Sequence, residues 1–242
     1  AYRVNKAGMI EEILLLAEPV LSEGLETVLQ AANPHLKITP IQSLARLEAK
    51  CRGRQEGTRL ISFGSEIIVP TAILEVLGAG AYNFHPGPPT HPGRFPSCFF
   101  IYGGGERFGS TVHEMAAKVD SGPINAVDWF AVPNDVDRLT LDAMSFRSLF
   151  ALFRKLAPHL AVSAEPLPCI NEAWSGRATT QQDFEAMCRL PPDVSEQEFR
   201  LRYRAVGEGP NHALEISLFG HRFCLRNQQS NPEVLIGGEK RS

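Results

Sequence analysis

Apolar and polar positions change their spacing several times along the first half of the chain. We expect strands at four short apolar runs, which are residues 13–16, 36–38, 60–63 and a run that ends at Asn83. We expect helices where apolar residues recur at helical spacing, which are residues 22–32, 44–51 and 70–78. Ser22 is the expected N-cap of the first helix, and Asn33 with Pro34 ends it. Strands alternating with helices are typical of an α/β fold with a mostly parallel, Rossmann-like sheet and helices on both faces.

The second half of the chain continues with two strands and a long helix. We expect the strands at residues 111–115 and 124–132. The helix is predicted by apolar residues that share one face, which are Leu139, Ala143, Phe146, Phe150 and Phe153. Asp120 then lies in the turn between the two strands, where Gly122 and Pro123 permit an unusual backbone.

The composition changes after residue 160, where Pro166 and Pro168 mark a linker. Ser195 followed by Glu198 is a candidate capping box for a helix. Apolar and polar residues alternate over residues 213–225, as in a β-hairpin. We therefore predict two parts, a first domain over residues 1–165 and a linker with a small C-terminal module over residues 166–242.

Composition limits the functional classes. The 242 residues are 43% hydrophobic and 21% charged, which suffices for the core of a soluble enzyme. No apolar run approaches the length of a bilayer span, and residues 13–17 are too few for a signal-peptide core, so we expect a cytoplasmic protein without membrane contact. A net charge of −3 gives no overall attraction for nucleic acid. The five scattered cysteines indicate neither a disulfide framework nor a zinc site.

Three polar residues carry the candidate chemistry. Asn83 and His85 stand at positions i and i+2, so both side chains leave the same face of a strand and converge on one point. Asp120 adds a carboxylate from the predicted turn. An amide donor, an imidazole and a carboxylate are the groups that acyl transfer to an amine requires, because an oxyanion must be stabilised and a proton moved.

Three motifs around these residues resemble a known family. They are Asn83-x-His85-Pro86, the segment from Phe63-Gly64 to Ile67-Ile68-Val69-Pro70, and Gly109-x-Thr111-x-His113 followed by Val119-Asp120-Ser121-Gly122-Pro123-Ile124. Over residues 13–160 the chain resembles the folate-dependent formyltransferases, which include methionyl-tRNA, glycinamide ribonucleotide and sugar-nucleotide N-formyltransferases. Enzymes of this family move a formyl group from 10-formyltetrahydrofolate to an amine.

The resemblance implies a role for individual residues. Asn83, His85 and Asp120 fall on the catalytic trio. We expect Asn83 and a protonated His85 to donate hydrogen bonds to the formyl oxygen, and Asp120 to favour the imidazolium and relay the amine proton toward the leaving nitrogen. The implied cofactor is 10-formyltetrahydrofolate, and no metal is required. The implied cofactor-binding residues are Phe63, Ile67, Ile68, Val69 and Val119. Residues 67–69 are most simply explained as core ahead of a helix, and both roles can hold together.

Features that the chain lacks reduce the range of possible amine acceptors. The predicted first strand is followed by residues 18–21, Glu-Pro-Val-Leu, with Gly24 alone, where ribonucleotide-using members carry a glycine-rich phosphate cradle. Residues 166–242 are too few and too weakly charged to resemble a complete tRNA-binding domain. We therefore expect a small acceptor, most simply an amino sugar on a nucleotide carrier. Arg94 resembles a loop arginine of some sugar-nucleotide members.

Three other functions fit the same sequence. The same trio fits a 10-formyltetrahydrofolate hydrolase, in which water replaces the amine. A methionyl-tRNA formyltransferase-like enzyme and a non-catalytic binding module with this fold are the others. His91 and His113 fit either a structural role or a place at the edge of the substrate. The sequence is also compatible with a homo-oligomer.

Overall fold

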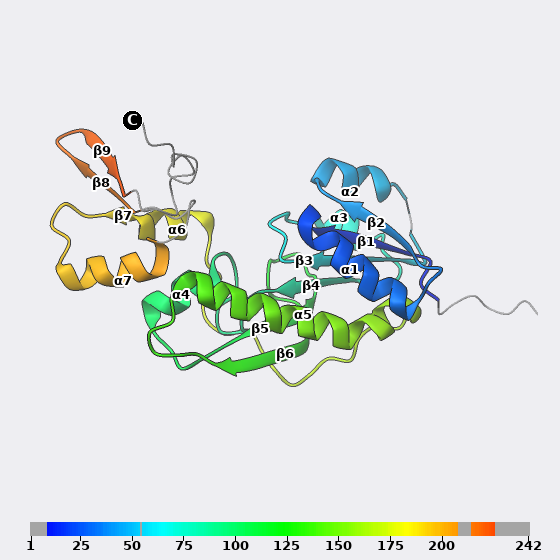
Figure 1. Cartoon of the computed structure of the whole chain (residues 1–242). Coiled ribbons are helices and arrows are strands. Elements are labelled where there is room, and N and C mark those ends of the chain that lie inside the picture. The colour runs from blue at the N-terminus through cyan, green and yellow to red at the C-terminus, as the bar shows by residue number, and fades with distance from the viewer. Residues whose placement is uncertain (1–8, 54, 208–213, 226–242) are drawn as a thin grey trace, which may run out of the picture.

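A six-stranded sheet forms the centre of the molecule (Figure 1). The computed structural model describes residues 9–53, 55–207 and 214–225. The strands lie in the order β2-β1-β3-β4-β5-β6, with β1 to β4 parallel and β5 and β6 antiparallel. Their bounds are β1 Glu12–Ala17, β2 Lys37–Ile41, β3 Thr58–Phe63, β4 Ala81–His85, β5 Arg107–Glu114 and β6 Ile124–Ala131. The α/β, Rossmann-like class predicted from the sequence is confirmed.

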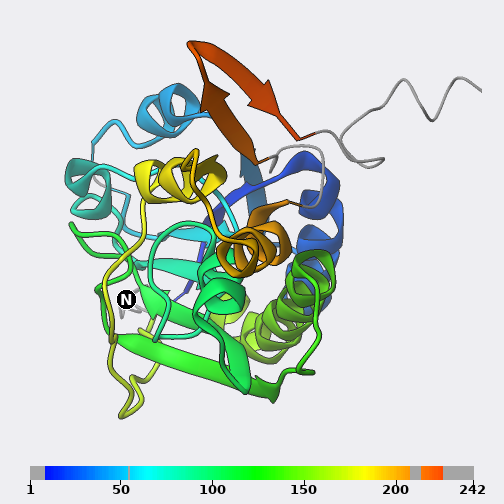
Figure 2. The same ribbon diagram turned by 90° about the vertical axis from the view of Figure 1, so that its left-hand side faces the viewer.

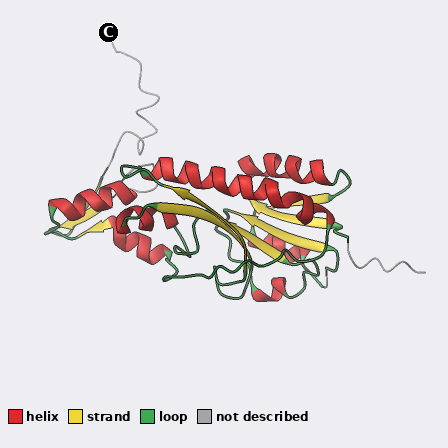
Figure 3. Ribbon diagram, turned by 90° about the horizontal axis from the view of Figure 1, so that it is seen from below, coloured by secondary structure: helices red, strands yellow, loops and turns green. Residues whose placement is uncertain are grey.

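Helices cover both faces of this sheet (Figure 3). Their bounds are α1 Pro19–Ala32, α2 Leu44–Lys50, α3 Thr71–Leu74 and α5 Arg138–Val162. In β1, Ile13 and Leu15 belong to the core that includes residues of α1 and α5, whereas Leu14 and Leu16 belong to the core that includes residues of α2 and α3. Successive strand side chains point to opposite faces, so a strand buried on both faces needs an uninterrupted apolar run.

Two predicted helix boundaries are wrong. α1 begins at Pro19 with Glu18 as its N-cap, because proline fits the first helical position, where its missing N–H costs nothing. Ser22 lies inside the helix and its hydroxyl donates to the Glu18 carbonyl at 3.3 Å. α3 ends at Leu74, before the predicted Gly78, because the chain next forms a β-bridge between Leu77 and Gln55. The end of α1 at Ala32, capped by Asn33, is as predicted.

The long helix α5 is confirmed, but of the five apolar residues predicted to share one face only Phe153 is fully buried. Phe146 and Phe150 are each 37% exposed, and the fully buried positions include Leu141 and Leu149. Serines share the buried face, and Ser145 satisfies its hydroxyl by donating to the Pro86 carbonyl at 2.8 Å. Spacing of apolar residues alone cannot show which of two apolar stripes is buried when polar residues with partners lie in the core.

The C-terminal module packs against α4 (Pro96–Gly103). Its elements are α6 Gln181–Cys188, β7 Arg189–Leu190, α7 Glu196–Val206, β8 Glu215–Leu218 and β9 His221–Cys224. Phe184 of α6 and Val206 of α7 share one apolar cluster with Cys98 and Phe100 of α4. The boundary between residues 165 and 166 stays a prediction.

The predicted hairpin is present as β8 and β9, which project at one end of the molecule (Figure 2). Ala213, where the predicted hairpin begins, lies outside the described residues. Ser195 caps α7 by accepting the Glu198 N–H at 3.2 Å. The Glu198 carboxylate instead accepts from Tyr102 and Arg202, so the second half of the predicted capping box is not formed. In the described part of the chain, no helix has the length and apolarity to cross a bilayer.

Candidate active site

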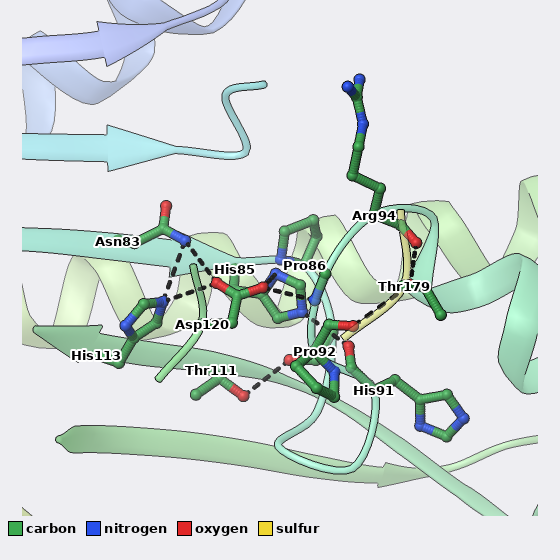
Figure 4. A network of polar contacts seen from close by, with 12 residues as sticks. Asn83, His85, Pro86, His91, Pro92, Arg94, Thr111, His113, Asp120 and Thr179 are labelled. Atoms are coloured by element: carbon green, nitrogen blue, oxygen red, sulfur yellow. Dashed lines mark hydrogen bonds and ion pairs between the residues drawn. The ribbon is translucent and has the colours of Figure 1, made fainter. Parts of the chain in front are cut away.

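The carboxyl end of β4 carries the centre of the site (Figure 4). Asn83 and His85 leave the face of β4 opposite to Tyr82 and Phe84, which belong to the core beneath α1 and α5. The predicted i, i+2 arrangement is therefore present. His85 is 5% exposed, because the strand end is covered by the loop of residues 86–94, which we call the catalytic loop.

Asp120 joins the two β4 residues from the turn between β5 and β6. Its Oδ2 accepts the Gly93 N–H at 2.7 Å and lies 3.5 Å from His85 Nδ1. Its Oδ1 accepts from Asn83 Nδ2 at 3.4 Å. Asp120 has a φ of 45°, a strained conformation for a residue with a side chain. The structure thus brings the three predicted residues together.

His113 is a fourth polar member of this cluster. It lies opposite Asn83 in the β4–β5 ladder, and its Nε2 lies 3.1 Å from Asn83 Nδ2 and 3.2 Å from Asp120 Oδ1. Its Nδ1–H donates to the Glu114 carbonyl at 2.7 Å. The pairing of β5 with β6 shifts at Val112/His113, and such irregularities re-aim side chains near functional sites. The Gly-x-Thr-x-His motif was the sequence signal for His113, but it did not show this contact.

Burial decides the resting charge of His85. Its Nε2 lies 3.1 Å from the His91 carbonyl, so this nitrogen carries the hydrogen and donates it. Burial lowers the pKa of His85, although the neighbouring Asp120 opposes this shift. We therefore assign a neutral imidazole with its Nδ1 lone pair on the Asp120 side. The sequence had suggested a protonated His85, because a motif does not show how deeply a side chain is buried.

Asp120 keeps its negative charge. Burial would raise the pKa of its carboxyl, but His85, His113 and the Gly93 N–H outweigh this and lower the pKa to about 2. A carboxylate of such low basicity is a poor proton acceptor. It is well suited to stabilise a positive charge that forms on a neighbouring imidazole.

A cavity of about 490 Å³ opens above these four residues. Its lining includes the predicted residues Ile67, Ile68, Val69 and Val119, in addition to Asn83, His85, His113 and Asp120. The side chains of Ile68 and Val119 are 69% and 45% exposed, so the rim offers apolar surface to a ligand. Phe63 does not line the cavity. It is 2% exposed and stacks on Phe84 in the core, with 5.7 Å between ring centroids.

Arg94 and Glu66 also line the cavity and form an ion pair with each other. Their side chains are 38% and 72% exposed, so solvent screens this pair and its contribution to stability is small. Arg94 is therefore available to exchange Glu66 for another anion. Among the described residues, no group of three His, Cys, Asp or Glu side chains could hold a metal ion.

No protein-family model matches the chain. Among solved structures, a sugar N-formyltransferase from Shewanella has a TM-score of 0.70 with 17% identity, covering 90% of this chain and 97% of that one. The chain has the formyltransferase fold. At this identity, the likeness shows the fold and not the substrate.

Two further structures with this fold differ in their acceptors. An N-formyltransferase from Helicobacter canadensis, solved with folinic acid and dTDP-3-aminofucose, has a TM-score of 0.61 and 17% identity, covering 88% of this chain and 85% of that one. A methionyl-tRNA formyltransferase from Clostridium thermocellum has a TM-score of 0.58 and 15% identity, covering 88% and 90%. The fold therefore serves both small and macromolecular acceptors.

Proposed function

We propose that this protein is a folate-dependent formyltransferase that moves the formyl group of 10-formyltetrahydrofolate to a primary amine of a small acceptor. The observation that carries the proposal is the convergence of Asn83, His85 and Asp120 on the floor of one cavity. The apolar rim at Ile68 and Val119 supports a folate cofactor, because a flat heterocycle gains free energy by covering such surface.

The proposed reaction begins with a neutral amine that attacks the formyl carbon. Asn83 Nδ2 exchanges its long 3.4 Å contact with Asp120 Oδ1 for a hydrogen bond to the developing oxyanion. Such a bond is typically worth a few kcal/mol in the transition state. The Nδ1 lone pair of His85 accepts the proton that the amine loses, and ionised Asp120 stabilises the imidazolium. His85 then returns the proton to the nitrogen of tetrahydrofolate as the carbon–nitrogen bond breaks. One carbon–nitrogen bond forms as another breaks, and the proton lost by the amine ends on tetrahydrofolate, so the step balances without a metal.

For the acceptor, we propose an amino sugar on a nucleotide carrier. Two cationic residues line the cavity, Arg94 and Lys118, and the planar guanidinium of Arg94 is suited to a phosphate or a hydroxyl. A guanidinium whose ion-pair partner is the exposed Glu66 loses little when an anionic ligand replaces that partner. The amino-sugar nucleotide bound by the Helicobacter canadensis enzyme supports the same acceptor class.

A panel of acceptors tests this proposal. The protein is incubated with 10-formyltetrahydrofolate and, separately, amino sugar nucleotides, glycinamide ribonucleotide, charged initiator tRNA or no amine. We expect mass spectrometry to detect a formylated amino sugar nucleotide. Formate released equally without any amine would indicate the hydrolase, and faster formylation of tRNA would indicate the methionyl-tRNA activity. No turnover of the cofactor in any mixture would indicate a binding module.

A pair of histidine variants ties the activity to the site. His85→Gln should lower turnover by at least about a hundredfold, the usual contribution of a positioned acid or base. His159→Gln is the matched control, because His159 lies on α5 and its Nε2 contacts the Glu165 carbonyl, outside the cavity. Equal turnover of the two variants would contradict the role of His85.

A further inference from the structure

Residues 169–180, which we call the strap, lie across the catalytic loop. The Ser175 N–H donates to the Pro89 carbonyl at 3.0 Å. Further along, the Thr179 N–H donates to the Pro92 carbonyl at 3.0 Å, and the Arg94 N–H donates to the Thr179 carbonyl at 2.9 Å. A segment that follows the predicted first domain is therefore bonded along its backbone to the loop that covers His85.

The strap reaches Asp120 through Gly93. Gly93 has a φ of 94°, and a Cβ at this position would lie 2.2 Å from the Thr179 carbonyl oxygen, so only glycine permits the close approach. The same residue donates its N–H to Asp120 Oδ2 at 2.7 Å. The position of the strap thus fixes one of the hydrogen bonds that hold the carboxylate.

Trp174 of the strap contacts the site directly from outside the cavity. Its ring lies perpendicular to that of His113, with 5.0 Å between centroids, and at 68° to that of His85, with 5.9 Å between centroids. Its Nε1–H donates to the Gly122 carbonyl at 2.9 Å. One half-buried side chain therefore touches both imidazoles and holds the turn that carries Asp120.

We propose that Trp174 is a positioning residue of this site. Trp174 does not line the cavity and would touch neither cofactor nor acceptor, so it acts through the two histidines and through the Asp120 turn. Edge-to-face aromatic contacts have a preferred geometry. The hydrogen bond from the indole N–H to the Gly122 carbonyl adds a third contact that holds the ring in place. Its kinetic consequence rests on the proposed formyl transfer, whereas its contacts can be tested without any substrate.

The contact is tested by NMR of the histidine ring protons in the ligand-free protein. An indole ring at this distance shifts the signals of neighbouring protons, so Trp174→Ala should move the signals of His85 and His113 and leave those of His159 in place. Trp129→Ala is the matched control, because Trp129, on β6, is the only other tryptophan of the chain. Unchanged His85 and His113 signals in a folded Trp174→Ala protein would overturn the proposal.

The positioning role is tested by kinetics of two variants. Trp174→Ala should lower kcat by about 10- to 100-fold, because small displacements of catalytic groups are costly, while KM for both substrates changes by less than about threefold. Trp174→Phe keeps an aromatic ring but loses the N–H bond to Gly122, so we expect a smaller loss. This variant also guards against misfolding of the alanine protein.

The outcomes separate the two proposals. A merely structural Trp174 would lower the melting temperature of the variants and leave kcat per folded molecule unchanged, which would overturn the positioning role. Absence of formyl transfer in the unsubstituted protein would remove the proposed function. In that case the histidine signals still decide whether Trp174 positions the polar cluster.

Discussion

Asp120 is the residue on which the polar cluster depends. Its two oxygens accept from donors of two segments, Asn83 on β4 and Gly93 in the catalytic loop, and Oδ1 also lies 3.2 Å from His113 Nε2 on β5. His85 Nδ1 lies 3.5 Å from the same carboxylate. The charge of this carboxylate opposes the effect of burial, which lowers the pKa of His85.

Replacing Asp120 should therefore change the titration of His85. Burial already lowers the pKa of His85, and Asp120 is the group that opposes this shift by favouring the imidazolium. Asp120→Asn removes the opposing charge, so the midpoint should fall further below the ordinary value of about 6.5. NMR titration of the His85 ring protons measures both midpoints, with His159 as the internal reference. An unchanged or higher midpoint in Asp120→Asn would contradict this electrostatic account.

The exposed rim of the cavity permits a test of cofactor binding with little risk of unfolding. Ile68 is 69% exposed, so Ile68→Asp should leave the fold intact but place a carboxylate where an apolar ligand would lie. We expect calorimetry to show at least about a tenfold loss of affinity for a folate analogue. Val20→Asp is the matched control, because Val20 is 85% exposed on α1 and does not line the cavity. Equal affinity of the two variants would move the folate site elsewhere.

For single residues, the sequence predicted which side chains come together but not the protonation of His85 or its contact with Trp174. The i, i+2 spacing of Asn83 and His85 follows from strand geometry and requires no tertiary information. The neutral state of His85 depends on its burial. Its contact with Trp174 depends on a residue that lies about 90 positions further along the chain. Such properties arise only when the chain is folded.

The elements of the fold differ in how far the sequence specifies them. β1 contains a continuous apolar run from Ile13 to Ala17 and was predicted because a strand buried on two faces needs such a run. β3 is also buried throughout, but the sequence predicted only its second part from residue 60, because Thr58 and Arg59 are polar. α4 was not predicted, because it is a short segment with apolar residues all around it, including Cys98, Phe100 and Ile101. An amphipathic pattern exists only where one face of a helix meets water.

Arg59 joins two elements inside the molecule. Its side chain is fully buried on β3, and the guanidinium donates to carbonyls at the end of α5, Leu160 at 2.7 Å and Ser163 at 2.8 Å. It also donates to the carbonyls of Ala79 at 2.9 Å and Glu165 at 3.2 Å. The last carbonyls of a helix have no partner within the helix and carry partial negative charge, so a cation is favourable there.

Loss of this guanidinium should destabilise the protein strongly. Arg59→Met leaves several buried carbonyls without a donor, so we expect the free energy of unfolding to fall by at least about 3 kcal/mol. Arg59→Lys should recover part of this, because an ammonium cannot reproduce the planar fork. Urea unfolding measures both, with Arg147→Met on the exposed side of α5 as the control. Equal stability of the Arg59→Met and Arg147→Met proteins would show that the four hydrogen bonds are not important.

On the scale of the whole molecule, the two predicted parts are joined by shared packing. The apolar cluster around α4 includes residues from both sides of position 165. Within it, Phe184 stacks on Phe95 with 4.0 Å between ring centroids. The strap adds backbone bonds to the catalytic loop. Parts that share a core and a site cannot unfold independently without exposing apolar surface of both.

The chain should therefore unfold in a single transition in which the C-terminal module takes part. Phe184 is 5% exposed, so Phe184→Ala should lower the free energy of unfolding by about 3–5 kcal/mol and shift the whole transition. Phe219→Asn is the control, because Phe219 is 99% exposed in the β8–β9 turn and asparagine tolerates its φ of 52°. Calorimetry and near-UV circular dichroism should give coincident curves. Two separate transitions, with only one of them shifted by Phe184→Ala, would instead show that residues 166–242 fold as an independent module.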